Sequence, residues 1–166
     1  INVETKFDRV VSVEMFEKMQ NYARLMENIS EWLKHSGKLF VHIFCHQKFA
    51  YFFSTEGSDN WMGRYFFTGG LMPSEDLLLK FQKNLSLDKQ WRWNGRHYKQ
   101  TSNAWLKNMD REKFNILPIL EEVYGRKERN TWFQRWRIFF MACAELFAYK
   151  SGNQWFVAHY LFKKKS

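Results

Sequence analysis

The chain has 166 residues, of which 45% are hydrophobic and 19% aromatic, enough apolar material to form the core of one folded domain. Its formal net charge of +9 would suit an anionic partner, but the basic residues are spread among acids and aromatics and match no nucleic-acid-binding motif, so no nucleic acid partner is expected. The uncharged stretch at residues 138–144 is far shorter than the roughly 20 apolar residues that span a bilayer, so no transmembrane segment is expected.

The two cysteines, Cys45 and Cys143, both lie within apolar sequence. We therefore expect no disulfide framework and a reducing, intracellular location, either the cytoplasm or an organelle such as the mitochondrion. The first residue is Ile rather than Met, and residues 1–6 lack the basic and apolar pattern of a signal peptide. The chain is therefore expected to belong to a longer polypeptide.

The first elements predict a βαβ unit. Residues 7–13 contain a β-branched run with little polar alternation, which is typical of a strand covered on both faces in a parallel sheet. From Met15 to Leu33 apolar residues recur at alternating steps of four and three, which predicts an amphipathic helix that Gly37 ends. Residues 37–45 then predict a second parallel strand with both faces mostly buried.

Two carboxylates follow the first predicted strand. Glu14 ends the strand, and Glu17 comes three residues later, where the helix is expected to begin. Both acids should lie at the carboxyl edge of the sheet, where open α/β folds bind their ligands. A chemical site is therefore expected at this edge.

The rest of the chain predicts an aromatic loop, four further helices and two further strands. Residues 46–73 are rich in aromatic side chains without clean periodicity, so this loop is expected to cover something. The predicted elements that follow are a short helix opening at Pro73, a strand at 85–93 with a turn at Asn94 and Gly95, helices at about 101–109, 111–124 (kinked at Pro118) and 126–149, and a closing strand at 155–162.

No metal site is predicted. His42 and His46 share one face of the second predicted strand, but four extended residues separate them by about 13 Å. One ion cannot be bound across that distance, and the chain has no cysteine pairs with metal-binding spacing.

Six motifs occur in an order that resembles a known family. They are FDRVVSVEMFE, LFVHIFCH, WMGRYFFTGG followed by MPS, NGRHY, TSNAWLKNM, and WRIFFMACAELF leading to WFVAHYLFKK. Together they resemble the C-terminal half of the cyclopropane-fatty-acid-synthase group of S-adenosylmethionine-dependent methyltransferases, and within it the coclaurine N-methyltransferases. The resemblance implies an α/β fold: the C-terminal part of a Rossmann-like class I methyltransferase sheet with a helical, aromatic-rich substrate cap.

The resemblance also implies how the chain is organised. Residues 1–166 would form a single, incomplete methyltransferase domain, with sheet strands in 1–45, 85–95 and 154–164 and cap and helical segments in 46–84 and 96–150. The family's glycine-rich cofactor loop would lie upstream, so the S-adenosylmethionine site is expected mostly outside this chain. A missing N-terminal half or a partner chain would supply it.

Four residues take candidate catalytic roles from the resemblance. Glu14 and Glu17 would orient or deprotonate a substrate amine, since a buried carboxylate accepts protons readily. In the lipid-modifying relatives the residues matching His42, Glu17 and Tyr98 hold a bicarbonate that acts as base. Read without the resemblance, acids at a helix start and a histidine in an apolar strand are commonly structural.

Aromatic residues of the loop are candidate substrate-binding residues. Rings in this segment could form a pocket wall for a cationic amine or a sulfonium, because ring faces attract cations. Core packing explains the same residues equally well. The candidates are Trp61, Tyr65, Phe66 and Phe67.

The leading hypothesis is methyl transfer from S-adenosylmethionine to a small-molecule amine, with this chain as the C-terminal portion of the enzyme. One alternative is a cyclopropane-fatty-acid-synthase-like enzyme acting on a lipid. Another is a non-catalytic, methyltransferase-like subunit of a larger complex. The second alternative draws on Lys18, which stands where the family commonly has histidine, and which either pairs with Glu14 or acts as a base only if strongly desolvated.

Overall fold

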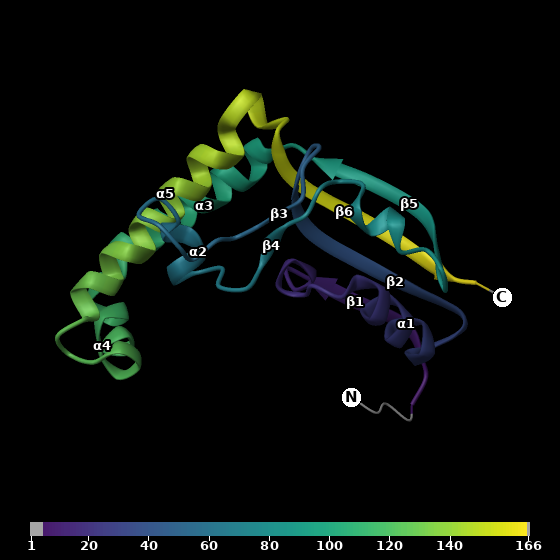
Figure 1. The fold of residues 1–166 in the computed structure, drawn as a ribbon. Helices are drawn as coiled ribbons and strands as arrows, with labels where there is room; N and C mark the ends of the chain where they lie inside the picture. Colours follow the sequence, from purple (N-terminus) through teal and green to yellow (C-terminus); the bar gives the residue numbers. More distant parts are fainter. Residues whose placement is uncertain (1–4, 166) are drawn as a thin grey trace. The chain divides into compact units, whose positions relative to one another are not determined.

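The computed structural model describes residues 5–165, which divide into two compact units (Figure 1). The sheet unit comprises the described residues up to Trp93 and from Phe156 onward, and the helical unit comprises Asn94–Trp155. Each unit is described by itself. The prediction of a single methyltransferase domain over 1–166 stays a prediction.

The sheet unit is built on a four-stranded sheet in the order β1-β2-β6-β5. Its strands are β1 (Phe7–Val13), β2 (Leu33–His46), β5 (Leu85–Trp93) and β6 (Trp155–Lys164). β1 is parallel to β2, and β5 is antiparallel to β6. The strands predicted at 7–13, 85–93 and 155–162 are confirmed.

Short elements connect these strands. They are the 3-10 turns η1 (Phe16–Lys18) and η2 (Leu77–Lys80), the helices α1 (Tyr22–Trp32) and α2 (Trp61–Tyr65), and a two-stranded antiparallel ribbon of β3 (Tyr51–Phe52) and β4 (Leu71–Met72). None of the helices within residues 5–165 is both long and apolar enough to cross a membrane.

The first predicted helix is shorter than its sequence pattern indicates. The side chain of Asn21 accepts a hydrogen bond from the Arg24 amide at 3.0 Å, so α1 begins at Tyr22 rather than at Met15. The helix ends at Trp32 because Leu33 already takes an extended conformation. Gly37 lies inside β2, where it ends no helix.

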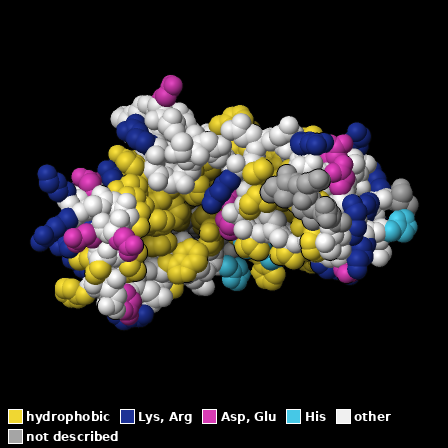
Figure 2. Space-filling view, turned by 90° about the horizontal axis from the view of Figure 1, so that it is seen from below, with side chains coloured by type: hydrophobic (Ala, Val, Ile, Leu, Met, Phe, Trp, Pro, Cys, Tyr) yellow, Lys and Arg dark blue, Asp and Glu magenta, His cyan; other side chains and the backbone are white. Residues whose placement is uncertain are grey.

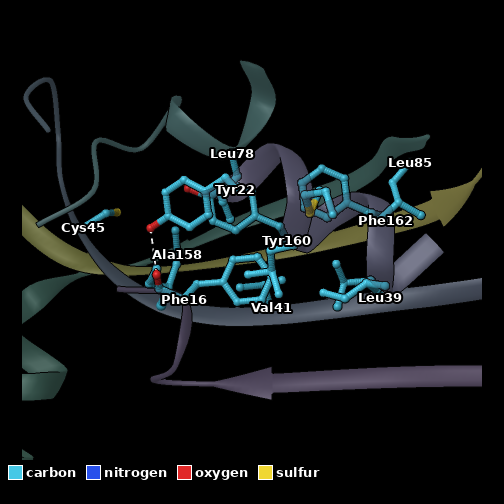
Figure 3. Close-up of a cluster of buried hydrophobic side chains, with 14 of the residues drawn as sticks. Phe16, Tyr22, Leu39, Val41, Cys45, Leu78, Leu85, Ala158, Tyr160 and Phe162 are labelled. Carbon is cyan, nitrogen blue, oxygen red and sulfur yellow. Dashed lines mark hydrogen bonds between the residues drawn. The ribbon is translucent and has the colours of Figure 1, made fainter. Parts of the chain in front are cut away.

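One face of the sheet carries the core of this unit. The buried side chains of β2 and β6 pack against those of α1, η1 and η2, and Figure 3 shows them converging between the strands and α1. Two tyrosines in this core satisfy their hydroxyl groups: Tyr22 donates to the Phe16 carbonyl at 2.8 Å, and Tyr160 donates to the Glu75 carbonyl at 2.6 Å. The core therefore buries large rings without stranding their polar atoms.

The prediction that both faces of the first strand are covered is wrong for the described residues. Val11 is 64% exposed and Val13 is 58% exposed, whereas Ser12 between them is buried. β1 lies at the edge of the sheet, and α1 packs on the opposite face. The β-branched run is therefore correct as a strand but is covered on one face only.

The helical unit consists of α3 (Gly95–Arg111), α4 (Lys113–Tyr124) and α5 (Arg129–Gly152). The predicted turn at Asn94 and Gly95 is instead the start of α3, because the Asn94 side chain accepts a hydrogen bond from the Arg96 amide at 2.9 Å. α4 continues through Pro118 and ends at Gly125, as the sequence predicts for its C-terminus.

Candidate functional site

Glu14 stands at a sharp turn directly after β1. Its backbone φ of 51° lies in the left-handed region, which a non-glycine residue seldom adopts, and its amide donates to the His42 carbonyl at 3.1 Å. That hydrogen bond ties the turn to β2. The strained backbone therefore holds the Glu14 side chain beside the neighbouring strand.

Glu17 is buried in the turn that follows. Its side chain is 1% exposed, and one carboxyl oxygen, Oε2, has no hydrogen-bond partner among residues 5–165. The pKa of Glu17 is raised to about 7, mainly by burial and also by the charge of Glu14, while a backbone hydrogen bond and the charge of Lys18 oppose this. A carboxyl group that titrates near neutral pH is suited to accept or donate a proton.

His42 connects Glu14 to the sheet. Its Nε2 lies 3.0 Å from Glu14 Oε1, and both side chains are 29% exposed. Glu14 Oε1 is itself buried and has no aligned hydrogen-bond donor in the described part of the chain, so this contact is one of proximity. The predicted residues Glu14, Glu17 and His42 thus gather at the end of β1.

The fourth predicted catalytic residue, Tyr98, belongs to the helical unit. It lies in the first turns of α3, and its ring packs edge-on against Phe147 at 4.5 Å and against Trp105 at 6.0 Å between centroids. A joint role for Tyr98 with Glu17 and His42 stays a prediction.

The four predicted substrate-binding aromatics form two clusters. The Trp61 ring lies 5.8 Å from Tyr65 and 5.2 Å from Phe66, while Phe67 stacks on Phe53 at 4.8 Å. All four predicted residues are partly exposed. The structure therefore shows these rings packed against other aromatic rings, and a substrate-binding role stays a prediction.

The comparisons with known proteins place this geometry in a family. The sequence model of the family described as mycolic acid cyclopropane synthetase matches residues 1–156. The chain belongs to this family. It spans about half the length of the curated relatives it matches.

Known proteins similar to this chain include plant and bacterial enzymes. The chain is 41% identical to (S)-coclaurine N-methyltransferase from Papaver somniferum over 98% of this chain and 47% of that protein. It is 34% identical to pavine N-methyltransferase from Thalictrum flavum subsp. glaucum, over 98% and 46%. Cyclopropane-fatty-acyl-phospholipid synthase from Escherichia coli (strain K12) is 25% identical over 93% of this chain and 37% of that protein.

Solved structures confirm the predicted fold class. Coclaurine N-methyltransferase bound to N-methylheliamine and SAH superposes with a TM-score of 0.88 at 34% identity, over 99% of this chain and 50% of that one. The cyclopropane synthase MmaA2 from Mycobacterium tuberculosis gives a TM-score of 0.74 at 16% identity, over 98% and 57%, which bears on the fold alone. The chain therefore has the α/β fold of this methyltransferase group.

Lys18, the departure from the family pattern, does not pair with Glu14. The two positions are not on one helix, because Glu14 has a left-handed backbone and only Phe16–Lys18 is helical, as a 3-10 turn. Lys18 is exposed, and its positive charge lowers the pKa of Glu17. The side chain beside Glu14 is that of His42, whereas the sequence analysis considered Lys18 as its partner.

Sequence reasoning missed two residues that contact His42 or its neighbour. His159 Nε2 lies 2.8 Å from His42 Nδ1, and Trp93 Nε1 donates to His159 Nδ1 at 2.9 Å. The strands that carry them are correctly predicted, but the order of strands in the sheet is not visible in local sequence patterns.

His46, the other histidine weighed for a metal site, caps a turn instead. Its Nδ1 accepts the amides of Lys48 at 3.0 Å and Phe49 at 2.8 Å. Within residues 5–165 no cluster of three or more histidine, cysteine or acidic side chains could hold a metal ion.

The helical unit contains an open apolar cavity of about 680 Å³. Rings from α3 and α5 form much of its wall, among them Trp105, Trp136 and Phe140.

On the face shown in Figure 2, lysine and arginine side chains are scattered among acidic and hydrophobic ones. The distribution of charge on this face therefore marks no single basic stripe.

Proposed function

We propose that this chain is the C-terminal portion of an S-adenosylmethionine-dependent N-methyltransferase that acts on a small-molecule amine. The single observation that carries the proposal is the buried Glu17 carboxyl group, with its pKa near 7, beside Glu14 and His42. Support for an amine comes from 41% and 34% identity to plant enzymes named as N-methyltransferases.

The site chemistry fits a cationic guest. An ammonium group must lose a proton before its nitrogen lone pair can attack a methyl carbon, and Glu17 takes that proton at neutral pH. Glu14 contributes a negative charge that holds the cation in place. S-adenosylmethionine, when bound, supplies an electrophilic methyl group on a positively charged sulfur.

The exposed edge strand supports the proposal that the chain is part of a larger domain. β1 pairs with β2 alone in the described residues, and its Phe7, Val11 and Val13 are exposed. An exposed apolar edge strand invites pairing with another strand. We propose that an upstream segment pairs with β1 and provides the glycine-rich cofactor loop.

Intact mass of the polypeptide isolated from its native source tests this architecture. We expect a mass near twice that of the 166 residues, as the coverage of about half of each relative predicts. A native mass matching these residues alone would refute it and would favour a separate partner chain or a structural subunit.

Methyl transfer by the complete protein tests the activity. With methyl-labelled S-adenosylmethionine, we expect label to enter (S)-coclaurine, the amine in the name of a similar plant enzyme, at least about tenfold faster than it enters vesicles of unsaturated phospholipid. The reverse preference would indicate the lipid enzyme. Failure to bind S-adenosylmethionine by calorimetry would support the non-catalytic subunit and would overturn the proposal.

A further inference from the structure

Three neighbouring strands bring two histidines and a tryptophan into a single row. His42 lies on β2, His159 on β6 and Trp93 on β5, and these strands are adjacent in the sheet. His42 Nδ1 and His159 Nε2 are 2.8 Å apart, and Trp93 Nε1 is 2.9 Å from His159 Nδ1. Both separations are those of hydrogen bonds.

The tryptophan sets the direction of this row. An indole nitrogen only donates, so His159 Nδ1 must accept and carries no proton. The proton of neutral His159 is then on Nε2, from which it is donated to His42 Nδ1. The remaining proton of His42 is thereby on Nε2, the atom 3.0 Å from Glu14 Oε1.

The same row opposes protonation of His42. A second proton would sit on His42 Nδ1 and face the proton on His159 Nε2. His159 could accept that proton's hydrogen bond only if its own proton moved from Nε2 to Nδ1. There the proton would face the N–H group of Trp93, and that hydrogen bond would be lost. Desolvation by burial lowers the pKa of His159, which agrees with a neutral ring.

We propose that Trp93 and His159 are positioning residues that hold His42 as a neutral imidazole with its proton on Nε2. His42 then carries an N–H group at Nε2, 3.0 Å from Glu14 Oε1, and does not act as a base at that atom. The catalytic consequence rests on the proposed function: the proton released by an amine goes to the carboxylates and not to His42. The charged and titratable groups facing His42 are Glu14 after β1, Glu17 in η1 and His159 on β6.

Nitrogen-15 NMR of the histidine rings in the complete protein tests the tautomer directly. In the wild type we expect a protonated Nε2 and an unprotonated Nδ1 for His42. Trp93→Phe keeps a ring but removes the hydrogen-bond donor. The nitrogen-15 chemical shifts of the two His42 ring nitrogens should therefore move toward each other, as expected for a mixture of tautomers. Trp132→Phe, in α5 of the helical unit, where the ring stacks on Tyr124, is the control and should leave the His42 signals unchanged.

Two substitutions of His159 separate positioning from packing. His159→Gln can accept from Trp93 and donate to His42, so it should retain the wild-type tautomer. His159→Leu fills similar space without either hydrogen bond. In this variant the His42 proton should no longer be confined to Nε2, and kcat should fall about tenfold. The glutamine variant should recover most of that kcat.

The outcomes distinguish this inference from the proposed function. The inference would be overturned, whatever the activity, if wild-type His42 carried its proton on Nδ1. It would also be overturned if neither Trp93→Phe nor His159→Leu changed the His42 NMR signals. A tautomer that follows Trp93 and His159 in a protein without methyl transfer would uphold the positioning role and reject the proposed activity.

Discussion

Turnover by the complete protein is expected to fall by about 10²- to 10⁴-fold when Glu17 is replaced by glutamine, while affinity for S-adenosylmethionine stays nearly unchanged. Glutamine has almost the same size as glutamate but cannot take a proton. Glu17 is the buried carboxyl group whose pKa lies near 7, and its Oε2 has no hydrogen-bond partner among residues 5–165. In the proposed architecture the cofactor loop lies upstream, so binding of S-adenosylmethionine should not depend on the Glu17 side chain.

The measurement pairs single-turnover kinetics with calorimetric binding of S-adenosylmethionine. In the wild type kcat/KM should rise with pH through about 7 as Glu17 loses its proton, and Glu17→Gln should lack that limb. Glu31→Gln, an exposed acid on α1, is the matched control and should behave as wild type. Full turnover by Glu17→Gln would remove Glu17 from the mechanism.

The elements that the sequence predicted well are those whose ends are encoded locally. β5 at Leu85–Trp93 matches its alternating pattern, and α4 stops at Gly125, whose φ of 84° suits glycine. The first helix was predicted too long because Met15 and Met19 continue its apolar spacing. An Asn21 cap overrides that spacing, since its side chain accepts the Arg24 amide at the helix start, and η1 is a separate 3-10 turn before it.

The site was predicted only as far as chain neighbours and family motifs reach. The sequence places Glu14, Glu17 and His42 in one candidate site, and they lie together after β1 and on β2; their catalytic roles stay predictions. His159 and Trp93 were not identified, because their role depends on β6 lying between β2 and β5. Strand order results from the packing of the whole sheet, and period-two patterns within one strand do not contain it.

Stability of the sheet unit should depend on pH through Glu17. Its pKa is about 7 when folded and 4.5 when unfolded, so the folded state holds the proton more tightly. This contribution is fully present below pH about 4.5 and is lost as pH rises through about 7. The difference corresponds to about 3 kcal/mol, an upper value because the site can relax around the charge.

Glu17→Gln should remove this dependence, because glutamine stays neutral. In urea unfolding at matched pH, the variant should match the wild type closely near pH 4.5 and exceed it by up to about 3 kcal/mol at pH 8. Comparing the two proteins at each pH cancels the titrating groups that do not interact with Glu17, and Glu31→Gln should show a constant difference. A constant difference for Glu17→Gln as well would place its pKa outside this window.

The two Glu17 predictions together separate a catalytic carboxylate from a structural one. A structural acid that is replaced by its amide would be expected to lose stability, because its ionised form is the one with partners. At Glu17 the ionised form has an orphaned oxygen in the described structure and is disfavoured by burial. Loss of turnover combined with a gain of stability above pH 7 would therefore indicate an acid retained for proton transfer at the expense of the fold.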